Sequence, residues 1–240
     1  ISVSQINLSK LKSIVKGIIK GCELAGCNLV GGETAEMPGT YEKEKFDIAG
    51  FAVGLVEKNK ILNKKIRNGD LILAVPSNGL HSNGYSLIRK ILNQTKIDPT
   101  DFSLSGKNLI DHLMAPTRIY AKVLLKLHEV LPIKAIAHIT GGGLVENLAR
   151  VIPTECKAMI DCSSWQMPEI FDWLWDAGNI DHLEMYKTFN CGIGMVLCVS
   201  AKHEKKFLDA LKLEGEQAYV IGEIALNTRD EGLVELIGTH

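Results

Sequence analysis

The sequence predicts an α/β or α+β protein, because short apolar runs typical of buried strands alternate along it with amphipathic helical patterns. The chain has 240 residues, of which 46% are hydrophobic and 23% charged. A chain of this length and composition can bury a core as one large domain or two modest ones. It contains no internal repeat and no low-complexity tract, which argues against a solenoid.

The first quarter of the chain predicts one helix and two strands. Apolar residues recur at helical spacing from Leu11 to Ala25, with Ser9 as a plausible N-cap and Gly26 placed to end the helix. A short apolar strand is expected over 28–30. The run 47–56 is apolar on both alternations, which predicts an interior strand that is covered on both faces.

A lysine- and asparagine-rich stretch over 57–70 predicts a solvated connection and is the best candidate for a domain boundary. Beyond it, strands and helices alternate, apart from a polar stretch over 93–107. The expected strands are 71–75, 135–139, 195–199, 219–224 and 233–237. The expected helices lie around 85–92, from Pro116 to Leu127, and around 144–151, 169–177, 181–187 and 204–213.

Three loops follow buried strands and contain glycines, a design in which main-chain N–H groups can converge on an anion. The strongest is Thr140-Gly141-Gly142-Gly143, because three consecutive glycines between a strand and a helix suggest close approach of a ligand to the backbone. The alternative is a tight turn that only packs the helix on the sheet. We favour phosphate binding.

The other two loops carry side chains with possible chemistry. The loop 77–84 holds one imidazole, His81, between two Asn-Gly pairs, where it could exchange a proton with a substrate or simply belong to a turn. The loop 31–36 holds Glu33, Thr34 and Glu36, whose hard oxygens suit Mg²⁺ bound to nucleotide phosphates. A helix capping box is the alternative, although Met37-Pro38 follows too soon for an ordinary helix.

Composition and charge exclude several classes of protein. The 27 lysines and arginines nearly balance 28 acidic residues, for a net charge of −1, which argues against nucleic-acid binding through phosphate neutralisation. No apolar run approaches the roughly 20 residues needed to cross a bilayer. The scattered cysteines predict buried thiols, Cys191 included, in a cytoplasmic protein. His138 is expected to be a strand histidine, and Arg118 to form an ion pair or an anion contact.

Five blocks, in this order, resemble the phosphoribosylformylglycinamidine cyclo-ligase family, also called aminoimidazole ribonucleotide synthetases. They are Gly21 to Gly39 (GCELAGCNLVGGETAEMPG), Gly79 to Ser86 (GLHSNGYS), Ala115 to Tyr120 (APTRIY), Ala137 to Gly143 (AHITGGG) and Phe189 to Gly194 (FNCGIG). The resemblance runs through the whole chain. Family members also carry a preceding segment of roughly a hundred residues with an Asp-Gly-Val-Gly-Thr-Lys loop, which this sequence lacks.

The resemblance implies ATP-dependent ring closure of formylglycinamidine ribonucleotide to 5-aminoimidazole ribonucleotide in purine biosynthesis, with ADP and phosphate released. The implied residues are Gly31, Gly32, Glu33 and Thr34 for ATP, Glu33 for Mg²⁺, His81 and Asn83 for the reacting amide, and Thr140, Gly141, Gly142, Gly143 and Asn190 for substrate or phosphate. Such chemistry needs positioning and charge stabilisation rather than a protein nucleophile.

The resemblance also implies a two-domain fold and a homodimer. Residues 1–62 would be the C-terminal part of a truncated ATP-binding and dimerisation domain, and 63–240 a complete domain on a mixed sheet flanked by helices. Formylglycinamidine synthetase, selenophosphate synthetase, thiamine-phosphate kinase and a hydrogenase-maturation dehydratase share the superfamily and are alternative functions of one fold. A further alternative is an inactive module that only binds phosphate or dimerises.

Overall fold

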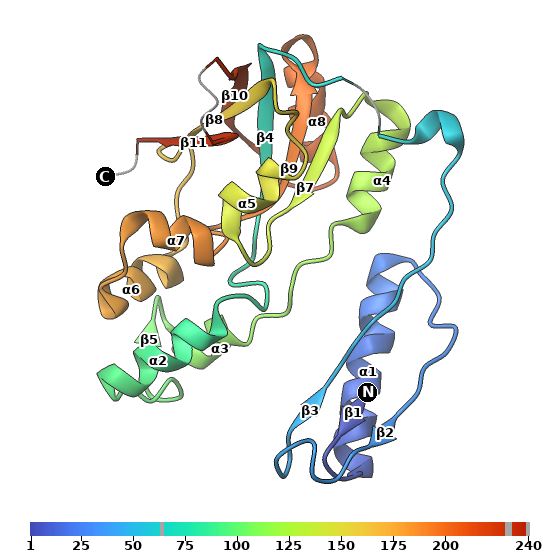
Figure 1. Cartoon of the computed structure of the whole chain (residues 1–240), viewed down its shortest axis with the longest axis vertical. Helices are drawn as coiled ribbons and strands as arrows, with labels where there is room; N and C mark the ends of the chain where they lie inside the picture. The colour runs from blue at the N-terminus through green and yellow to red at the C-terminus, as the bar shows by residue number, and fades with distance from the viewer. Residues whose placement is uncertain (63–64, 229–231, 239–240) are drawn as a thin grey trace. The chain divides into compact units, whose positions relative to one another are not determined.

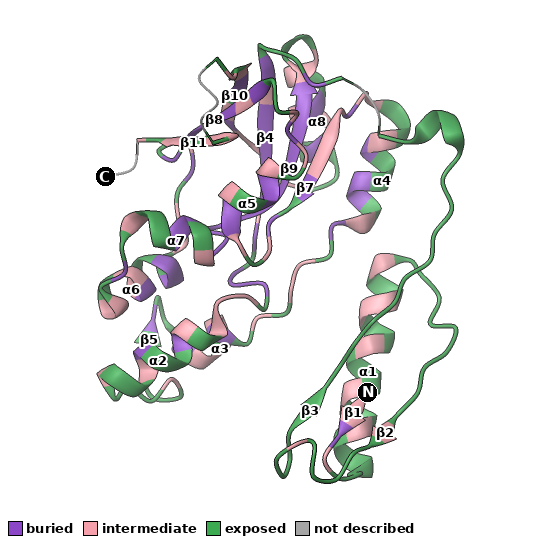
Figure 2. Cartoon of the chain, in the orientation of Figure 1, coloured by how far each residue is buried: buried purple, intermediate pink, exposed green. Residues whose placement is uncertain are grey.

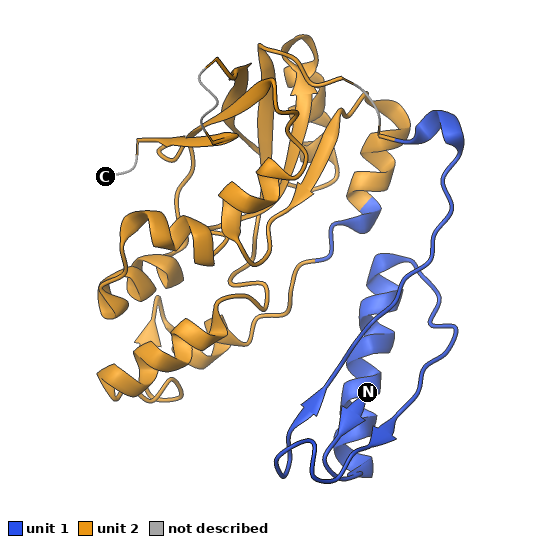
Figure 3. Ribbon diagram, in the orientation of Figure 1, with its two compact units in different colours: residues 1–61, 119–122 blue, residues 62–118, 123–240 orange. Residues whose placement is uncertain are grey.

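The computed structural model describes residues 1–62, 65–228 and 232–238 (Figure 1). The chain divides into two compact units (Figure 3). Unit 1 consists of Ile1–Ile61 and Ile119–Lys122, and unit 2 of Leu62–Arg118 and Val123–His240. Both units combine helices with small or mixed sheets, which confirms the predicted fold class. Among the described residues, no helix is both long and apolar enough to cross a membrane.

Unit 1 is built around the long helix α1 (Leu8–Ala25), which was predicted. Its N-cap is Asn7 rather than Ser9, since Asn7 Oδ1 accepts a hydrogen bond from the Lys10 amide and thereby satisfies a free N–H of the first turn. The helix ends where Gly26 adopts a φ of 75°, the left-handed conformation that glycine allows at no steric cost.

The strands of unit 1 differ from the prediction. Three two-residue strands, β1 (Ser2–Val3), β2 (Ala35–Glu36) and β3 (Phe46–Asp47), form a sheet in the order β2-β1-β3, with β1 parallel to β2 and antiparallel to β3. A short 3₁₀ helix, η1 (Lys58–Lys60), follows. The strands predicted over 28–30 and beyond residue 47 up to 56 are wrong, because those residues have irregular backbone.

The apolar side chains of these two segments are exposed rather than covered (Figure 2). Val30 is 95% exposed, Phe51 94% and Leu55 103%. A strand needs a neighbour to receive its backbone hydrogen bonds, and within the described residues none lies beside either segment. Apolar composition alone therefore did not produce a strand.

Unit 2 contains a six-stranded mixed sheet, in the order β11-β8-β10-β4-β9-β7, among the residues the structure describes. Every pair of neighbours is antiparallel except β11 and β8. The central strands are almost wholly buried, as their apolar composition predicted. The strands are β4 (Asp70–Pro76), β7 (Ala135–His138), β8 (Cys156–Asp161), β9 (Ile193–Ser200), β10 (Tyr219–Leu226) and β11 (Val234–Ile237).

The helices in the second part of the chain largely match the predicted segments. They are α2 (Tyr85–Thr95), α3 (Leu109–Leu113), α4 (Ala121–Val130), α5 (Gly143–Ala149), α6 (Glu169–Gly178), α7 (His182–Thr188), α8 (Glu204–Leu213) and the 3₁₀ helix η2 (Ala201–His203). Strand β8, helix α3 and the hairpin of β5 (Ser103–Leu104) with β6 (Lys107–Asn108) were not predicted. The hairpin occupies the end of the polar stretch, where composition indicated only a loop.

The helix predicted from Pro116 begins five residues later, at Ala121. The backbone before Ala121 is hydrogen-bonded to the loop that follows β4. The Asn78 side chain donates a 2.8 Å hydrogen bond to the Pro116 carbonyl, and the Arg118 amide donates to His81 Nε2 at 3.4 Å. These contacts hold the segment away from helical geometry.

The sheet brings the ends of three strands to one edge. Strands β4 and β7 both lie beside β9 and run antiparallel to it, so β4 and β7 are parallel to each other. The last residues of β4 and β7, Pro76 and His138, pair with Ile193 and Met195 at the start of β9. The loops that follow β4 and β7 and the segment that precedes β9 therefore meet at the same edge (Figure 1).

Candidate functional site

Three of the predicted motifs converge at this edge of the unit 2 sheet. The loop 77–84 follows β4, the loop 140–143 follows β7, and the segment 189–192 leads into β9. A Cβ added at Gly84 would lie 2.2 Å from Cε1 of Phe189, and one added at Gly141 would lie 3.6 Å from Oδ1 of Asn83. The loops therefore pack directly on one another.

Asn190 holds the loop 77–84 in place. It is 1% exposed, and its Oδ1 accepts 2.9 Å hydrogen bonds from Ser77 Oγ and from the Gly192 amide. Its Nδ2 donates to the Gly79 carbonyl at 2.8 Å. Protein groups therefore occupy both ends of the Asn190 carboxamide, which braces the loop 77–84, and the substrate contact that the resemblance implied for Asn190 stays a prediction.

His81 lies on the turn of this loop with a φ of 53°, a left-handed conformation that is uncommon for residues other than glycine. The imidazole is buried, and its Nε2 lies 2.7 Å from Asn78 Oδ1 and within 3.4 Å of the Asn78 and Arg118 amides. These contacts fix the ring. Its centroid is 6.4 Å from that of His138, the last residue of β7.

The surroundings of His81 make it a weak base. Burial, the adjacent His138 and the nearby Arg118 lower the pKa of His81 to about 4, in that order of effect. A buried imidazolium would have to be desolvated close to other cationic groups. At neutral pH, His81 is therefore an uncharged imidazole, which can donate or accept a hydrogen bond without carrying charge.

The glycine loop 140–143 is held from below by Asn147 of α5. Asn147 is buried, and its Nδ2 donates to the carbonyls of Gly141 at 3.2 Å and Gly143 at 2.8 Å. Within the described part of the chain, the amides of Gly141 and Gly142 have no hydrogen-bond acceptor. The carbonyls of this loop are thus turned toward the protein, and two N–H groups remain available for an anion.

Two glycines of this loop are required by space as well as by conformation. Gly142 has a φ of 91°, and Gly143 a φ of 59°. A Cβ at Gly143 would lie 1.8 Å from the Tyr186 carbonyl oxygen, so the packing of α5 on α7 also needs glycine. Close helix packing therefore explains Gly143, whereas the available amides of Gly141 and Gly142 are compatible with anion binding.

An acidic side chain covers the same loop. A Cβ at Gly142 would lie 2.3 Å from Glu146 Oε2, which places this carboxylate over the glycine backbone. A carboxylate in the first turn of a helix is stabilised by the helix dipole. An incoming phosphate must therefore displace the flexible Glu146 side chain.

The remaining predicted residues lie in unit 1, where Gly31, Gly32, Glu33 and Thr34 are exposed in irregular backbone before β2. The Glu33 carbonyl accepts a 2.8 Å hydrogen bond from the nitrogen of Ile1. The other acid, Glu36, accepts the Ile6 amide at 2.7 Å. The capping-box alternative fails here, because Ala35–Glu36 is a strand.

Within the described residues, no three histidine, cysteine or acidic side chains gather as they would around a protein-bound metal. Mg²⁺ is commonly held by one or two carboxylates together with substrate phosphates. The exposed Glu33 carboxylate fits that kind of shared site and does not fit a cage built by the protein alone.

His138 and Arg118 were not predicted as site residues, but both lie beside His81. His138 is a strand residue, as expected, at the end of β7, and its ring centroid lies 6.4 Å from that of His81. Arg118 forms an ion pair with Glu216 and donates from Nη1 to the Pro76 carbonyl at 3.3 Å, which confirms the predicted ion pair. Their positions within the AHITGGG and APTRIY motifs were the only signal in the sequence.

Cys191 is a structural thiol, as the sequence indicated. Its side chain is fully buried, and burial raises its pKa well above the ordinary value for a thiol. Its carbonyl accepts a 2.9 Å hydrogen bond from Trp165 Nε1, which ties the buried indole to the same segment. A thiol that stays protonated is a poor nucleophile.

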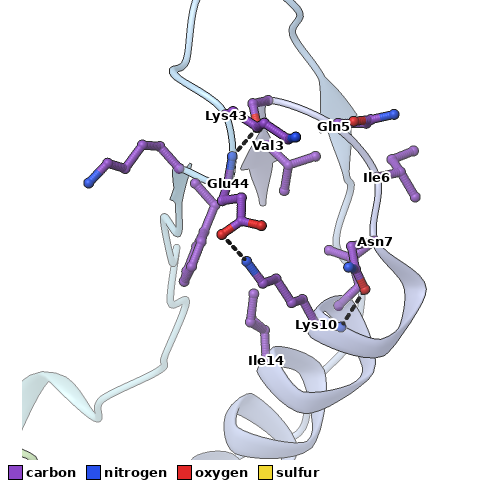
Figure 4. Close-up of a pocket in the computed structure, with 12 residues that line it drawn as sticks. Val3, Gln5, Ile6, Asn7, Lys10, Ile14, Lys43 and Glu44 are labelled. Carbon is purple, nitrogen blue, oxygen red and sulfur yellow. Dashed lines mark hydrogen bonds and ion pairs between the residues drawn. The ribbon is translucent and has the colours of Figure 1, made fainter.

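Unit 1 has a cavity of about 330 Å³ between the start of α1 and the segment 43–46 (Figure 4). Two of its charged groups form an ion pair, because Lys10 Nζ lies 3.5 Å from Glu44 Oε2, and the Glu44 amide donates to Ser4 Oγ at 3.0 Å. None of the predicted site residues lines it. This cavity therefore adds nothing to the site.

Two family models match the chain. Residues 67–234 match the model described as "AIR synthase related protein, C-terminal domain", and residues 1–56 match "AIR synthase related protein, N-terminal domain". Together the two matches include every predicted site residue.

Several solved structures share the fold. Thiamine-monophosphate kinase from Stenotrophomonas maltophilia K279a is 15% identical, with a TM-score of 0.68 over 99% of this chain and 70% of that chain. HypE from E. coli, a hydrogenase maturation protein, is 16% identical, with a TM-score of 0.62 over 100% of this chain and 68% of that one. T. maritima PurL complexed with AMPPCP is 14% identical, with a TM-score of 0.57 over 94% of this chain and 32% of that chain. At these identities the similarity establishes the fold.

Proposed function

We propose that this chain, which belongs to the AIR synthase related protein family, acts in the ATP-dependent cyclisation of formylglycinamidine ribonucleotide to 5-aminoimidazole ribonucleotide. ADP and phosphate are the other products. The observation that carries the proposal is the convergence of the 77–84 and 140–143 loops, both cyclo-ligase motifs, at one edge of the sheet. Two available backbone amides and a neutral imidazole thereby come together.

The chemistry implied for the cyclo-ligases makes few demands on protein side chains. ATP phosphorylates the formyl-amide oxygen, an internal nitrogen attacks the carbon, and phosphate leaves. Charge stabilisation of the phosphoryl group supplies most of the catalysis in such reactions. The two available amides at Gly141 and Gly142 support a role of Thr140 to Gly143 in binding a phosphate.

His81 and Asn83 are the proposed catalytic residues. Because the pKa of His81 is lowered to about 4, the ring acts as an uncharged hydrogen-bonding group toward the reacting amide and not as an imidazolium acid. Asn83 donates to the His81 carbonyl at 2.8 Å and lies against Gly141, so it links the imidazole turn to the phosphate loop. Asn190 anchors the loop that carries both residues by donating to the Gly79 carbonyl.

In unit 1, Gly31, Gly32, Glu33 and Thr34 are proposed to hold ATP, with the Glu33 carboxylate as a ligand of Mg²⁺. Mg²⁺ bound there would neutralise charge on the transferring phosphates. An ATP analogue bound to a relative with the same fold, T. maritima PurL with AMPPCP, supports nucleotide use by this fold. The exposure of Glu33 is compatible with a site completed by phosphate oxygens.

We also expect a homodimer formed through unit 1. The exposed apolar side chains of Val30, Phe51, Val53 and Leu55 support this, because such a surface is usually covered by another chain. Analytical ultracentrifugation tests it. A Phe51→Glu variant should shift the sedimentation toward the monomer, whereas Lys58→Glu, an exposed change outside the apolar stretch, should not.

The function is tested with two matched proteins. The first is the 240-residue chain, and the second is a chain that also carries the family's preceding segment. Calorimetry measures binding of formylglycinamidine ribonucleotide and of ATP with Mg²⁺, and a coupled assay measures ADP release together with formation of aminoimidazole ribonucleotide. We expect the longer protein to turn over and the 240-residue chain to bind weakly and turn over little.

Other substrates define what would contradict this proposal. If the longer protein phosphorylates thiamine monophosphate and leaves formylglycinamidine ribonucleotide unchanged, the assigned reaction is wrong. If the 240-residue chain cyclises the ribonucleotide as fast as the longer one, the preceding segment is dispensable. Binding of phosphate by both proteins without turnover by either would favour the alternative of an inactive module.

A further inference from the structure

Unit 2 has a second concave feature beside the site, a cavity of about 530 Å³. It is lined by the first residues of the His81 loop, Ser77 to Gly79, by the turn at Ser105, by the segment Gln166 to Ile170, and by Tyr219. Its volume lies within the roughly 300–1,000 Å³ typical of small-molecule sites. None of Thr140 to Gly143 lines it, so it is separate from the glycine loop.

The lining of the cavity combines polar residues with apolar ones, Met167, Pro168 and Ile170, and has little positive charge. The lining residues include an acid, Glu169, an amide residue, Gln166, a hydroxyl residue, Ser105, and an aromatic residue, Tyr219. No lysine or arginine is among the described residues that line it, and the imidazole of His112 is engaged with the Leu104 carbonyl at 3.0 Å. A phosphate would find a carboxylate there rather than a cation, so phosphate is the wrong ligand for this cavity.

A carboxylate, an amide and an aromatic face are the groups that recognise a sugar. Acidic side chains accept hydrogen bonds from ribose hydroxyls in dinucleotide-binding proteins. Aromatic rings pack against the apolar face of a compact ligand while polar groups fix its orientation. We propose that this cavity binds the ribosyl group of a sugar phosphate, with the Glu169 carboxylate accepting hydrogen bonds from its hydroxyls.

The loop 77–84 connects this cavity to the site described above. Asn78 lines the cavity, and its side chain also lies 2.7 Å from His81 Nε2. At the other end of the same loop, Asn83 lies against Gly141. If the ribosyl group occupies the cavity, the phosphate and the reacting nitrogen of the same substrate lie outside the cavity and must be bound by other residues. The identification of the sugar phosphate as a ribonucleotide rests on the proposed function, whereas sugar binding itself does not.

The test compares two probes, D-ribose 5-phosphate and inorganic phosphate, by calorimetry and by ¹⁵N chemical shifts. The wild-type chain should bind ribose 5-phosphate about tenfold more tightly than phosphate, the increment expected for a hydrogen bond to a charged acceptor. Glu169→Gln should remove most of that preference and leave phosphate affinity unchanged. The matched control is Asp176→Asn, an exposed acid on the same helix α6 that does not line the cavity, and it should change neither.

Chemical shifts locate the sugar. Ribose 5-phosphate should shift the amides of Gln166, Met167, Glu169, Ile170 and Tyr219, and inorganic phosphate should not. The proposal is overturned if the two probes bind equally, if Glu169→Gln keeps the preference, or if only Gly141 and Gly142 respond. If ribose 5-phosphate shifts 166–170 while inorganic phosphate fails to affect Gly141 and Gly142, the sugar site stands and the phosphate role of the glycine loop is wrong.

Discussion

The Ser77 hydroxyl donates a 2.9 Å hydrogen bond to Asn190 Oδ1 although the two residues are 113 positions apart in the chain. Both side chains are buried at the edge of the sheet where β4 ends and β9 begins. This contact joins a loop predicted to be functional to a motif whose role the sequence left open. The contact anchors the His81 loop to the segment that leads into β9.

Replacing Asn190 should destabilise the protein and disorder the His81 loop. In Asn190→Ala, the Ser77 hydroxyl, the Gly192 amide and the Gly79 carbonyl lose their partner in a buried place. We expect a loss of about 2–4 kcal/mol in the free energy of unfolding, measured by urea denaturation. Asn93→Ala, at an exposed position on α2, is the control and should change stability by less than about 0.5 kcal/mol. Equal effects of the two variants would contradict the bracing role.

Alanine substitutions at three glycines should rank in stability according to the space around them. All three have positive φ, but a new Cβ meets a backbone carbonyl at 1.8 Å in Gly143, the side chain of Glu146 at 2.3 Å in Gly142, and nothing within 4 Å in Gly69. Gly69→Ala should cost about 1–2 kcal/mol for conformation alone. Gly143→Ala should cost about 3 kcal/mol or more, and Gly142→Ala an intermediate amount. Thermal denaturation gives the ranking. A Gly143→Ala variant as stable as Gly69→Ala would show that the Tyr186 carbonyl does not pack closely against Gly143.

Removing the Glu146 carboxylate should strengthen phosphate binding at the glycine loop. The carboxylate lies over Gly142 and competes with any anion there. Glu146→Gln keeps the shape of the side chain while removing its charge, and we expect a gain of about fivefold to tenfold in phosphate affinity by calorimetry. Glu155→Gln, on the turn before β8, is the control and should behave as wild type. Unchanged affinity in Glu146→Gln would mean that phosphate binds elsewhere.

Stability should fall as the pH is lowered from about 6.5 toward 4. The pKa of His81 is lowered to about 4 from an unfolded value near 6.5, so between these values the unfolded state binds the extra proton. The free energy of unfolding is therefore highest, as far as His81 is concerned, above pH 6.5. It falls as the pH is lowered toward 4, by at most about 1.4 kcal/mol per pH unit. His81→Asn, a residue that tolerates positive φ, should remove this contribution. A His81 ring that titrates near pH 6.5 by NMR would contradict the expected environment.

Thiol labelling should separate the two units. In unit 2, Cys156, Cys162, Cys191 and Cys198 are buried, and burial raises the pKa of Cys162 to about 11 and of Cys198 to about 12. Cys27 in unit 1 is exposed and should react first with a thiol reagent at pH 8, which mass spectrometry can locate. The buried four should react only after unfolding. Rapid labelling of Cys191 in the native protein would refute its structural role.

Much of unit 2 could be predicted locally. The period-2 and period-3.6 patterns identified α6, α8 and most of the central strands, because a buried strand or an amphipathic helix must show its periodicity in the sequence. The helix expected from Pro116 failed because Asn78 and His81 hold that backbone from another loop. The strand expected over 47–56 failed because its neighbours, and not its own side chains, decide whether a strand forms.

The amino-acid sequence was enough to identify the segments predicted to carry chemistry, because the glycine loop at Thr140, the imidazole of His81 and the acid at Glu33 were all visible as motifs. Only the tertiary structure decided which of them meet. The order β4-β9-β7 brings the first two loops to one edge, places the His138 ring 6.4 Å from that of His81, and lets Asn190 hydrogen-bond to the His81 loop. Strand order depends on pairings between residues far apart in the chain, and no local periodicity encodes these pairings.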